Sequence, residues 1–233
     1  MTIKCVWEHN GNDTLLYADN FVGAYTRGEN LSKALGKMEA EISAYLRWLG
    51  EPVPENMTTE IVQESACTLQ ISDADSEVIF NSERAPLSPA EYERLKALAL
   101  KSARDLHELY SSVPDIDKSC LPERTTFYGS RPRTAREMYE HTRSVNSYYF
   151  AEIGTDADNS GSIFECRLRG FTLLEQQADH LTAPAAEGSY GEFWSLRKVL
   201  RRFIWHDRIH AKAMLRMAES TFGHGSCANP FKF

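Results

Sequence analysis

Residues 194 to 214 read WSLRKVLRRFIWHDRIHAKAM, which has the pattern of an amphipathic helix that continues to about Ser220. Two histidines, His206 and His210, lie four residues apart within it. Residues at this spacing lie one turn apart on the same helix face, so both imidazole rings can point at one ion. The stretch therefore predicts a long helix with two candidate metal ligands.

Three further stretches between residues 88 and 180 have helical periodicity, and each starts with Ser or Thr followed three residues later by Glu. In this spacing the hydroxyl group and the glutamate each satisfy a free backbone N–H at the helix start. Four helices of similar length, joined by polar loops, predict an up-down four-helix bundle whose core can hold a metal site. The start signals are Ser88 with Glu91, Thr134 with Glu137, Ser162 with Glu165 and, for the fourth helix, either Ser189 or Ser195. The first three helices are expected to end near Tyr110, Ile153 and His180.

The N-terminal part has a different pattern, with β-forming residues around a turn-like HNGND and then a helix from Asn30 to the stop signal at Gly50. The predicted strands are residues 2 to 8, 14 to 18, 60 to 71 and 77 to 81. We therefore expect the α+β class. A small ββαβ-type domain over residues 1–81 precedes a four-helix bundle over residues 88–220, and SERAPLSP links them.

The composition limits both the partners and the compartment. Of the 233 residues, 42% are hydrophobic and 25% are charged, which is enough to bury a core. The net charge of -7 disfavours nucleic acid as a partner, and the basic residues spread around the last helix are typical of a solvated face. No segment approaches the roughly 18 apolar residues of a membrane span, and the N-terminus lacks a signal peptide's apolar core. Five scattered cysteines suit a reducing compartment, so we expect a cytoplasmic chain without a membrane partner.

A metal site with catalytic character needs a third ligand, because such sites usually combine three protein ligands with a water molecule. The best candidate is His141, in the middle of the predicted helix REMYEHTRSVNSYY, since Met138, Val145 and Tyr148 share its inward face. A single histidine is more often structural or solvated than a ligand. Here two histidines lie one turn apart and a third lies on a partner helix. With this arrangement, the metal-site interpretation and the structural interpretation carry equal weight.

The pair also matches part of the HExxH motif of zinc proteases, in which the glutamate is the general base. Here Asp207 takes that position with a shorter side chain, and no additional downstream ligand follows, which disfavours a protease. Arg202, one turn before His206, is a candidate to bind an anionic cofactor group. We expect structural or solvated roles for the remaining histidines, which are His9, His107, His180 and His224.

The stretches TAREMYEHTRSVNSYY (134–149) and WSLRKVLRRFIWHDRIHAKAM (194–214) resemble the DinB-like superfamily, over about residues 88–220. Its members are up-down four-helix bundles that bind a divalent metal, often nickel or zinc. The resemblance implies that His141, His206 and His210 bind zinc or nickel here. Characterised relatives are thiol-dependent transferases or isomerases, so it also implies a low-molecular-weight thiol, such as bacillithiol or mycothiol, and a small electrophilic substrate. Family members commonly carry Glu at the position of Asp207.

Residues 21–49, FVGAYTRGENLSKALGKMEAEISAYLRWL, resemble the HicB-like small α/β fold, in which a Gly-containing strand, a turn and a helix follow one another. This resemblance implies an accessory or interaction domain. Three functions stay open: a metal-dependent transferase or hydrolase that activates a thiol or water, a non-catalytic module that a metal only stabilises, and an antitoxin-like regulator. A homodimer is one assembly that the sequence leaves open.

Overall fold

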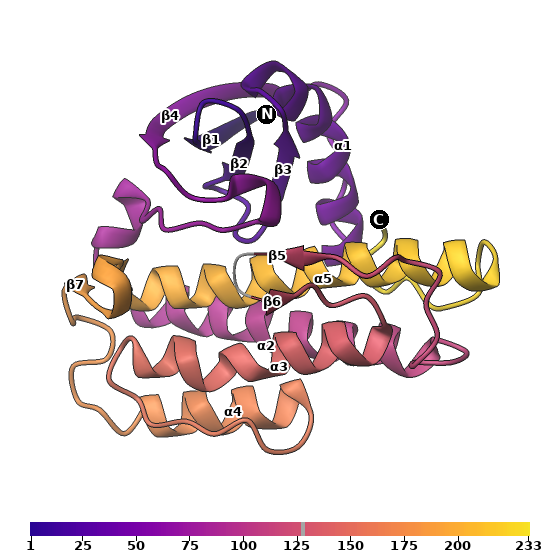
Figure 1. Cartoon of the computed structure of the whole chain (residues 1–233). Coiled ribbons are helices and arrows are strands. Elements are labelled where there is room, and N and C mark those ends of the chain that lie inside the picture. Colours follow the sequence, from indigo (N-terminus) through magenta and orange to yellow (C-terminus); the bar gives the residue numbers. More distant parts are fainter. Residues whose placement is uncertain (127–128) are drawn as a thin grey trace.

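The computed structural model describes residues 1–126 and 129–233, and its fold is α+β (Figure 1). The N-terminal part holds a mixed four-stranded sheet in the order β3-β2-β1-β4, with β1 antiparallel to β2 and parallel to β4. Its elements are β1 (Thr2–His9), β2 (Thr14–Ala18), β3 (Tyr25–Gly28), α1 (Leu31–Leu49) and β4 (Thr58–Ala66). The predicted hairpin and helix are confirmed. Because β3 precedes the helix, the order is βββαβ and not the predicted ββαβ; only Tyr25 and Thr26 are β-forming residues in this short strand.

The start and end of α1 follow from local chemistry. The side chain of Asn30 accepts a hydrogen bond from the backbone N–H of Lys33. Gly50 ends the helix with a φ of 73°, a left-handed conformation that glycine adopts without steric cost. Both boundaries are therefore as the sequence predicts.

The strand predicted for residues 77 to 81 is wrong. Among the described residues this segment pairs with no strand, because side chains satisfy its backbone instead. The backbone N–H groups of Glu77 and Val78 donate to the Glu8 carboxylate at 2.9 and 3.0 Å, and the carbonyl of Val78 accepts from Arg201. A short 3-10 turn, η2 (Asn81–Arg84), follows.

The helical part consists of α2 (Pro89–Ser112), α3 (Ala135–Ala151), α4 (Ile163–Leu174) and α5 (Leu196–Phe222), with two short hairpins, β5 (Thr125–Thr126) with β6 (Gly129–Ser130) and β7 (Ala186–Glu187) with β8 (Phe193–Trp194). The three predicted Ser/Thr-to-Glu caps are confirmed at the starts of α2, α3 and α4. Ser195, and not Ser189, caps α5 by accepting from the backbone N–H of Lys198. Helix α4 ends at Leu174, earlier than the predicted His180. None of the described helices is long and apolar enough to cross a membrane.

The N-terminal part packs directly on α5, which lies between it and the remaining helices (Figure 1). One apolar cluster runs from the sheet and α1 into the helical part. Gly23 permits the close approach, since its φ is +88° and a Cβ there would lie 2.3 Å from Cγ2 of Ile204. Salt bridges add to the contact: Glu83 of η2 pairs with Arg201 at 2.5 Å, and Glu41 of α1 pairs with Arg208 at 2.7 Å.

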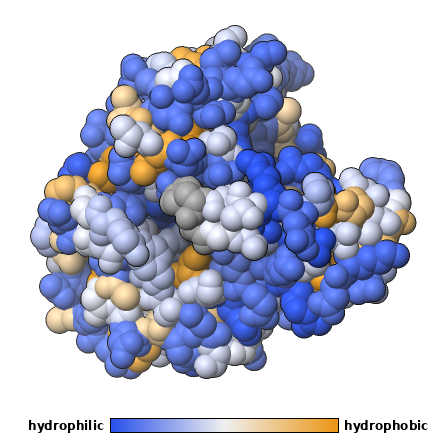
Figure 2. All heavy atoms as spheres, viewed as in Figure 1, coloured by the Kyte–Doolittle hydropathy of each residue, from blue (hydrophilic) through white to orange (hydrophobic). Residues whose placement is uncertain are grey.

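The solvated face predicted for the basic residues of α5 is therefore wrong for four of them. The N-terminal part and the segment before α5 cover these side chains, and each pairs with a carboxylate of Glu41, Glu83 or Glu192. The four are Lys198, Arg201, Arg202 and Arg208. Elsewhere, hydrophilic residues cover most of the face drawn in Figure 2. The division into domains at 1–81 and 88–220 stays a prediction.

Candidate metal centre

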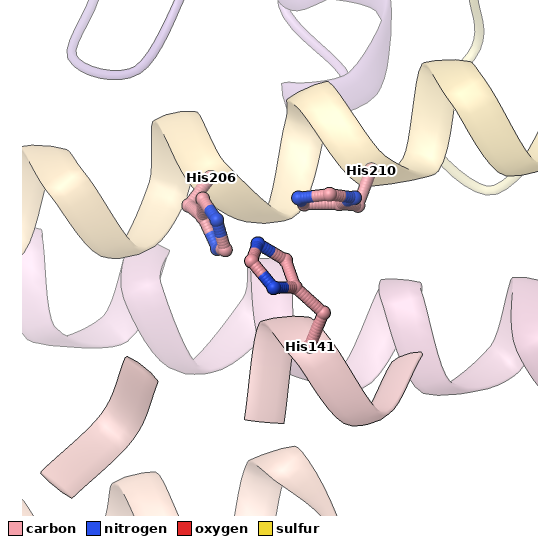
Figure 3. Close-up of side chains that lie close together, drawn as sticks. All are labelled: His141, His206 and His210. Carbon is pink, nitrogen blue, oxygen red and sulfur yellow. The ribbon is translucent and has the colours of Figure 1, made fainter. Parts of the chain in front are cut away.

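Three histidines from two helices converge at one point, as Figure 3 shows. His206 and His210 extend from successive turns of α5, and His141 extends toward them from α3. The ring centroids lie 4.6 Å apart for the α5 pair, 5.1 Å between His141 and His206, and 4.8 Å between His141 and His210. The structure thus brings together the three residues that the sequence singles out.

The pKa values of all three imidazoles lie below the ordinary value, which favours the neutral form near pH 7, although only His206 is buried and the other two residues are partly exposed. Loss of hydration lowers the pKa of His206 well below its ordinary value, and it lowers the pKa of His210 to about 3 and that of His141 in the same direction. For His206 the neighbouring imidazoles and Arg202 act in the same direction. A neutral imidazole has a free lone pair for a metal ion, so an incoming cation would displace no proton near pH 7.

The donor set fits a divalent cation. One ligand atom from each ring lies within 4.8 Å of the others, and among the described residues no fourth His, Cys, Asp or Glu joins the cluster. The Nδ1 atoms of His206 and His210 are buried and have no hydrogen-bond partner among the described residues, whereas buried polar atoms usually have one. Nitrogen atoms bound to one ion at about 2.1 Å can be no more than about 4.2 Å apart, so the rings would draw together slightly on binding. The cluster can therefore hold a metal ion with a coordination position left open.

A cavity of about 780 Å³ opens over this cluster, and all three histidines line it. Tyr148, Tyr149 and Trp205 form part of the apolar wall. Tyr149 is buried, whereas Tyr148 is partly exposed and lines the cavity. The open side of the cluster therefore faces a space large enough for a small organic molecule.

Asp207 takes no part in this cavity. Its carboxylate accepts two hydrogen bonds from Arg167 of α4, at 2.5 Å from Nη1 and 3.0 Å from Nη2, and both side chains are fully buried. Arg167 also donates to the carbonyl of Ala99 on α2. The acid between the two histidines thus ties α5 to α4 and α2, and it is not placed as the general base of an HExxH site.

Arg202 lines the cavity, but protein groups already bind its guanidinium. It donates to the backbone carbonyl of Ser76 and pairs with Glu192 at 2.7 Å. An incoming anion would have to compete with Glu192 for this charge. Anion binding by Arg202 stays a prediction.

The N-terminal part supplies one wall of this cavity, and the sequence carries no signal for it. Asp75 and Glu77, which follow the turn η1 (Ile71–Asp73), line the cavity opposite the helices. Burial raises the pKa of both carboxyl groups, and for Glu77 the nearby Glu8 carboxylate raises it further. Carboxylates with a raised pKa are available to accept a proton from a ligand. No local motif marks these residues, because only the tertiary fold places them beside the histidines.

The other histidines bind protein groups away from the cluster, in agreement with the structural roles expected of them. The pairs are His9 with Glu64, His107 with the hydroxyl of Tyr139, His180 with the carbonyl of Gln177, and His224 with Glu219.

No protein-family model, curated protein or solved structure matches the chain. Any assignment of function therefore depends on the side chains described above, and the DinB-like and HicB-like resemblances stay predictions.

Proposed function

We propose that this chain is a metal-dependent enzyme of the DinB-like type, in which a divalent ion, zinc or nickel, activates a small thiol or a water molecule. The observation that carries the proposal is the convergence of three neutral histidines beneath an open cavity of about 780 Å³. A bound divalent ion would supply positive charge that lowers the pKa of a thiol or water at its open position.

The side chains of the site support such chemistry in three ways. Neutral imidazoles leave the charge of a bound ion uncompensated, which favours ionisation of a ligand. Tyr149 and Trp205 are buried and exclude bulk water from one side, which strengthens electrostatic interactions in the cavity. Asp75 and Glu77 stand on the opposite wall as acceptors for the proton that the thiol or water gives up. The resulting nucleophile needs only an electrophile oriented beside it.

The alternative is a non-catalytic module in which the metal only stabilises the helices. A structural zinc site usually has four protein ligands and no access for other molecules. Here the described residues supply three histidines and a cavity over the fourth position. The geometry therefore favours chemistry over a purely structural ion.

We propose further that α2, α3, α4 and α5 form the up-down four-helix bundle of DinB-like proteins, with the N-terminal part as an accessory domain. In support, α2 packs against α3, α4 and α5, and α3 packs against α4 and α5. The candidate ligands come from the second and fourth of these helices, and DinB-like proteins carry one histidine on helix two and an HxxxH pair on a later helix. The N-terminal part contributes to the cavity wall, which favours an accessory role over an antitoxin-like one.

The proposal is tested by supplying zinc- or nickel-loaded protein with small thiols and a panel of electrophiles. We expect consumption of an electrophile that depends on both metal and thiol, that disappears in His206→Ala, and that persists in the control His180→Ala. A bound ion without thiol-dependent turnover across a broad panel would instead support the non-catalytic module.

A further inference from the structure

A second cavity of about 750 Å³ lies on the other side of the stripe formed by Ile209 and Ala213, between α5 and the N-terminal part. Five cationic side chains line it against three carboxylates, an excess of two positive charges in a chain whose net charge is -7. The cationic residues are Arg27, Lys37, Arg131, Lys212 and Arg216, and the acidic ones are Asp13, Glu29 and Glu41. The cavity is therefore electropositive within an acidic protein.

Three of these cations form no ion pair within the described part of the chain. The guanidinium of Arg27 donates to the carbonyl of Ser72, and Lys37 Nζ donates to the carbonyl of Arg27 at 2.7 Å, so neutral acceptors bind both. Arg216 is exposed. Of the three acids, Glu41 is already occupied by Arg208 and Lys212. Charged donors that meet only carbonyl groups or solvent can bind an oxyanion without first breaking a salt bridge.

The second cavity adjoins the first, and the two share part of their walls. Arg27, Arg131, Ile209 and Ala213 line both. Successive residues of α5 are rotated by about 100° around the helix axis. Around the helix, His210 is therefore followed by Ala213 and Ile209, and then by Arg216 and Lys212. Arg216 lies six positions after His210, which is about 9 Å along the helix axis. One ligand of moderate size can thus reach the histidines with one end and the cationic residues with the other.

We propose that the second cavity binds an oxyanion group, phosphate or carboxylate, of the substrate whose reactive end lies at the three histidines. The link to a substrate depends on the function proposed above, whereas the anion site itself does not depend on a metal. The arrangement assigns the substrate to molecules that carry an acidic group at the end opposite the reacting atom. The N-terminal part is then a specificity element, because it supplies Arg27 and Lys37.

The anion site is tested by calorimetry with inorganic phosphate at low salt. The protein is the whole chain, treated with a chelator so that no metal ion can bind the phosphate. We expect saturable binding that weakens about tenfold or more in Lys37→Gln, as befits loss of a charged hydrogen bond. Lys33→Gln is the matched control, because Lys33 lies one turn earlier on α1, is exposed and does not line the cavity. His206→Ala should bind phosphate normally. No binding, equal effects of the two lysine variants, or loss of binding in His206→Ala would overturn the proposal.

A second measurement identifies the source of the anion. Glutathione carries a thiol and carboxylates, whereas its diethyl ester keeps the thiol and loses those charges. In cobalt-loaded protein, the thiolate-to-cobalt absorption band should report tighter binding of the acid than of the ester, and phosphate should compete with the acid. Equal binding of both, unaffected by phosphate, would mean that the cavity holds a separate anion and would overturn the substrate assignment. Failure to bind cobalt would instead contradict the metal site and leave the phosphate result standing.

Discussion

Replacement of Asp207 by Asn tests whether the acid between His206 and His210 stabilises the fold through its ion pair with Arg167. In the wild-type chain its carboxylate holds Arg167 by two charge-assisted hydrogen bonds, at 2.5 and 3.0 Å, and neither side chain is exposed to solvent. Within the described part of the chain, Arg167 also donates a hydrogen bond to the carbonyl of Ala99 and lies over the ring of Phe203 at 4.3 Å. Its Nε has no partner among the same residues. Asp207→Asn therefore leaves a buried guanidinium without a counter-charge.

Breaking a buried ion pair from one side typically costs about 3–5 kcal/mol. An asparagine can still accept one hydrogen bond, so we expect the free energy of unfolding to fall by about 3 kcal/mol in a urea titration. Metal content and thiol-dependent turnover of the folded fraction should stay near wild-type values, because the side chain of Asp207 is directed to α4 and not to the cavity.

The double variant Arg167→Met with Asp207→Asn separates charge from packing. It should be more stable than Asp207→Asn alone, because it removes the uncompensated charge. If Asp207→Asn keeps wild-type stability but loses metal or turnover, the acid belongs to the site and not to the structural ion pair.

Burial also lowers the pKa of Lys198 to about 8, so between about pH 8 and 10.4 the unfolded chain binds a proton that the folded chain has lost. The free energy of unfolding of the wild type, minus that of Lys198→Met, should therefore rise by up to about 1.4 kcal/mol per pH unit in this range. If urea titrations give the same difference at every pH, the pKa of Lys198 is not lowered. An aromatic disulfide reagent should label exposed Cys120 quickly and buried Cys5 and Cys166 only on unfolding; rapid labelling of Cys5 would argue against its burial, which raises its pKa to about 11. Mobility shifts should reveal no duplex DNA binding near physiological salt, because carboxylates pair with four cations of α5; tight binding would revive a regulator function.

Local signals in the sequence account for much of the helical part. Ser88, Thr134 and Ser162 cap their helices because a hydroxyl and a glutamate three residues later need no distant partner. The i, i+4 spacing of His206 and His210 likewise fixes their common face. His141 could be nominated because it lies on the inward face of a neighbouring helix.

Features that depend on distant contacts could not be predicted. Val78 looks like a strand residue, but the carboxylate of Glu8 and the guanidinium of Arg201, both far away in the sequence, bind its backbone. The basic residues of α5 looked solvated because nothing in their own segment indicates that the N-terminal part covers them. Asp75 reaches the cavity for the same reason, through the packing of one part of the chain on the other.

Metal content of the purified protein, measured by elemental analysis after loading with zinc or nickel, shows whether the three histidines bind an ion. We expect one ion per wild-type chain and values well below stoichiometric in His141→Ala, His206→Ala and His210→Ala. Circular dichroism should remain largely helical in all three variants, because the apolar core carries most of the stability. His180→Ala, whose ring contacts the carbonyl of Gln177, should keep its ion. Full occupancy in all three cluster variants would mean that these histidines are not the metal ligands.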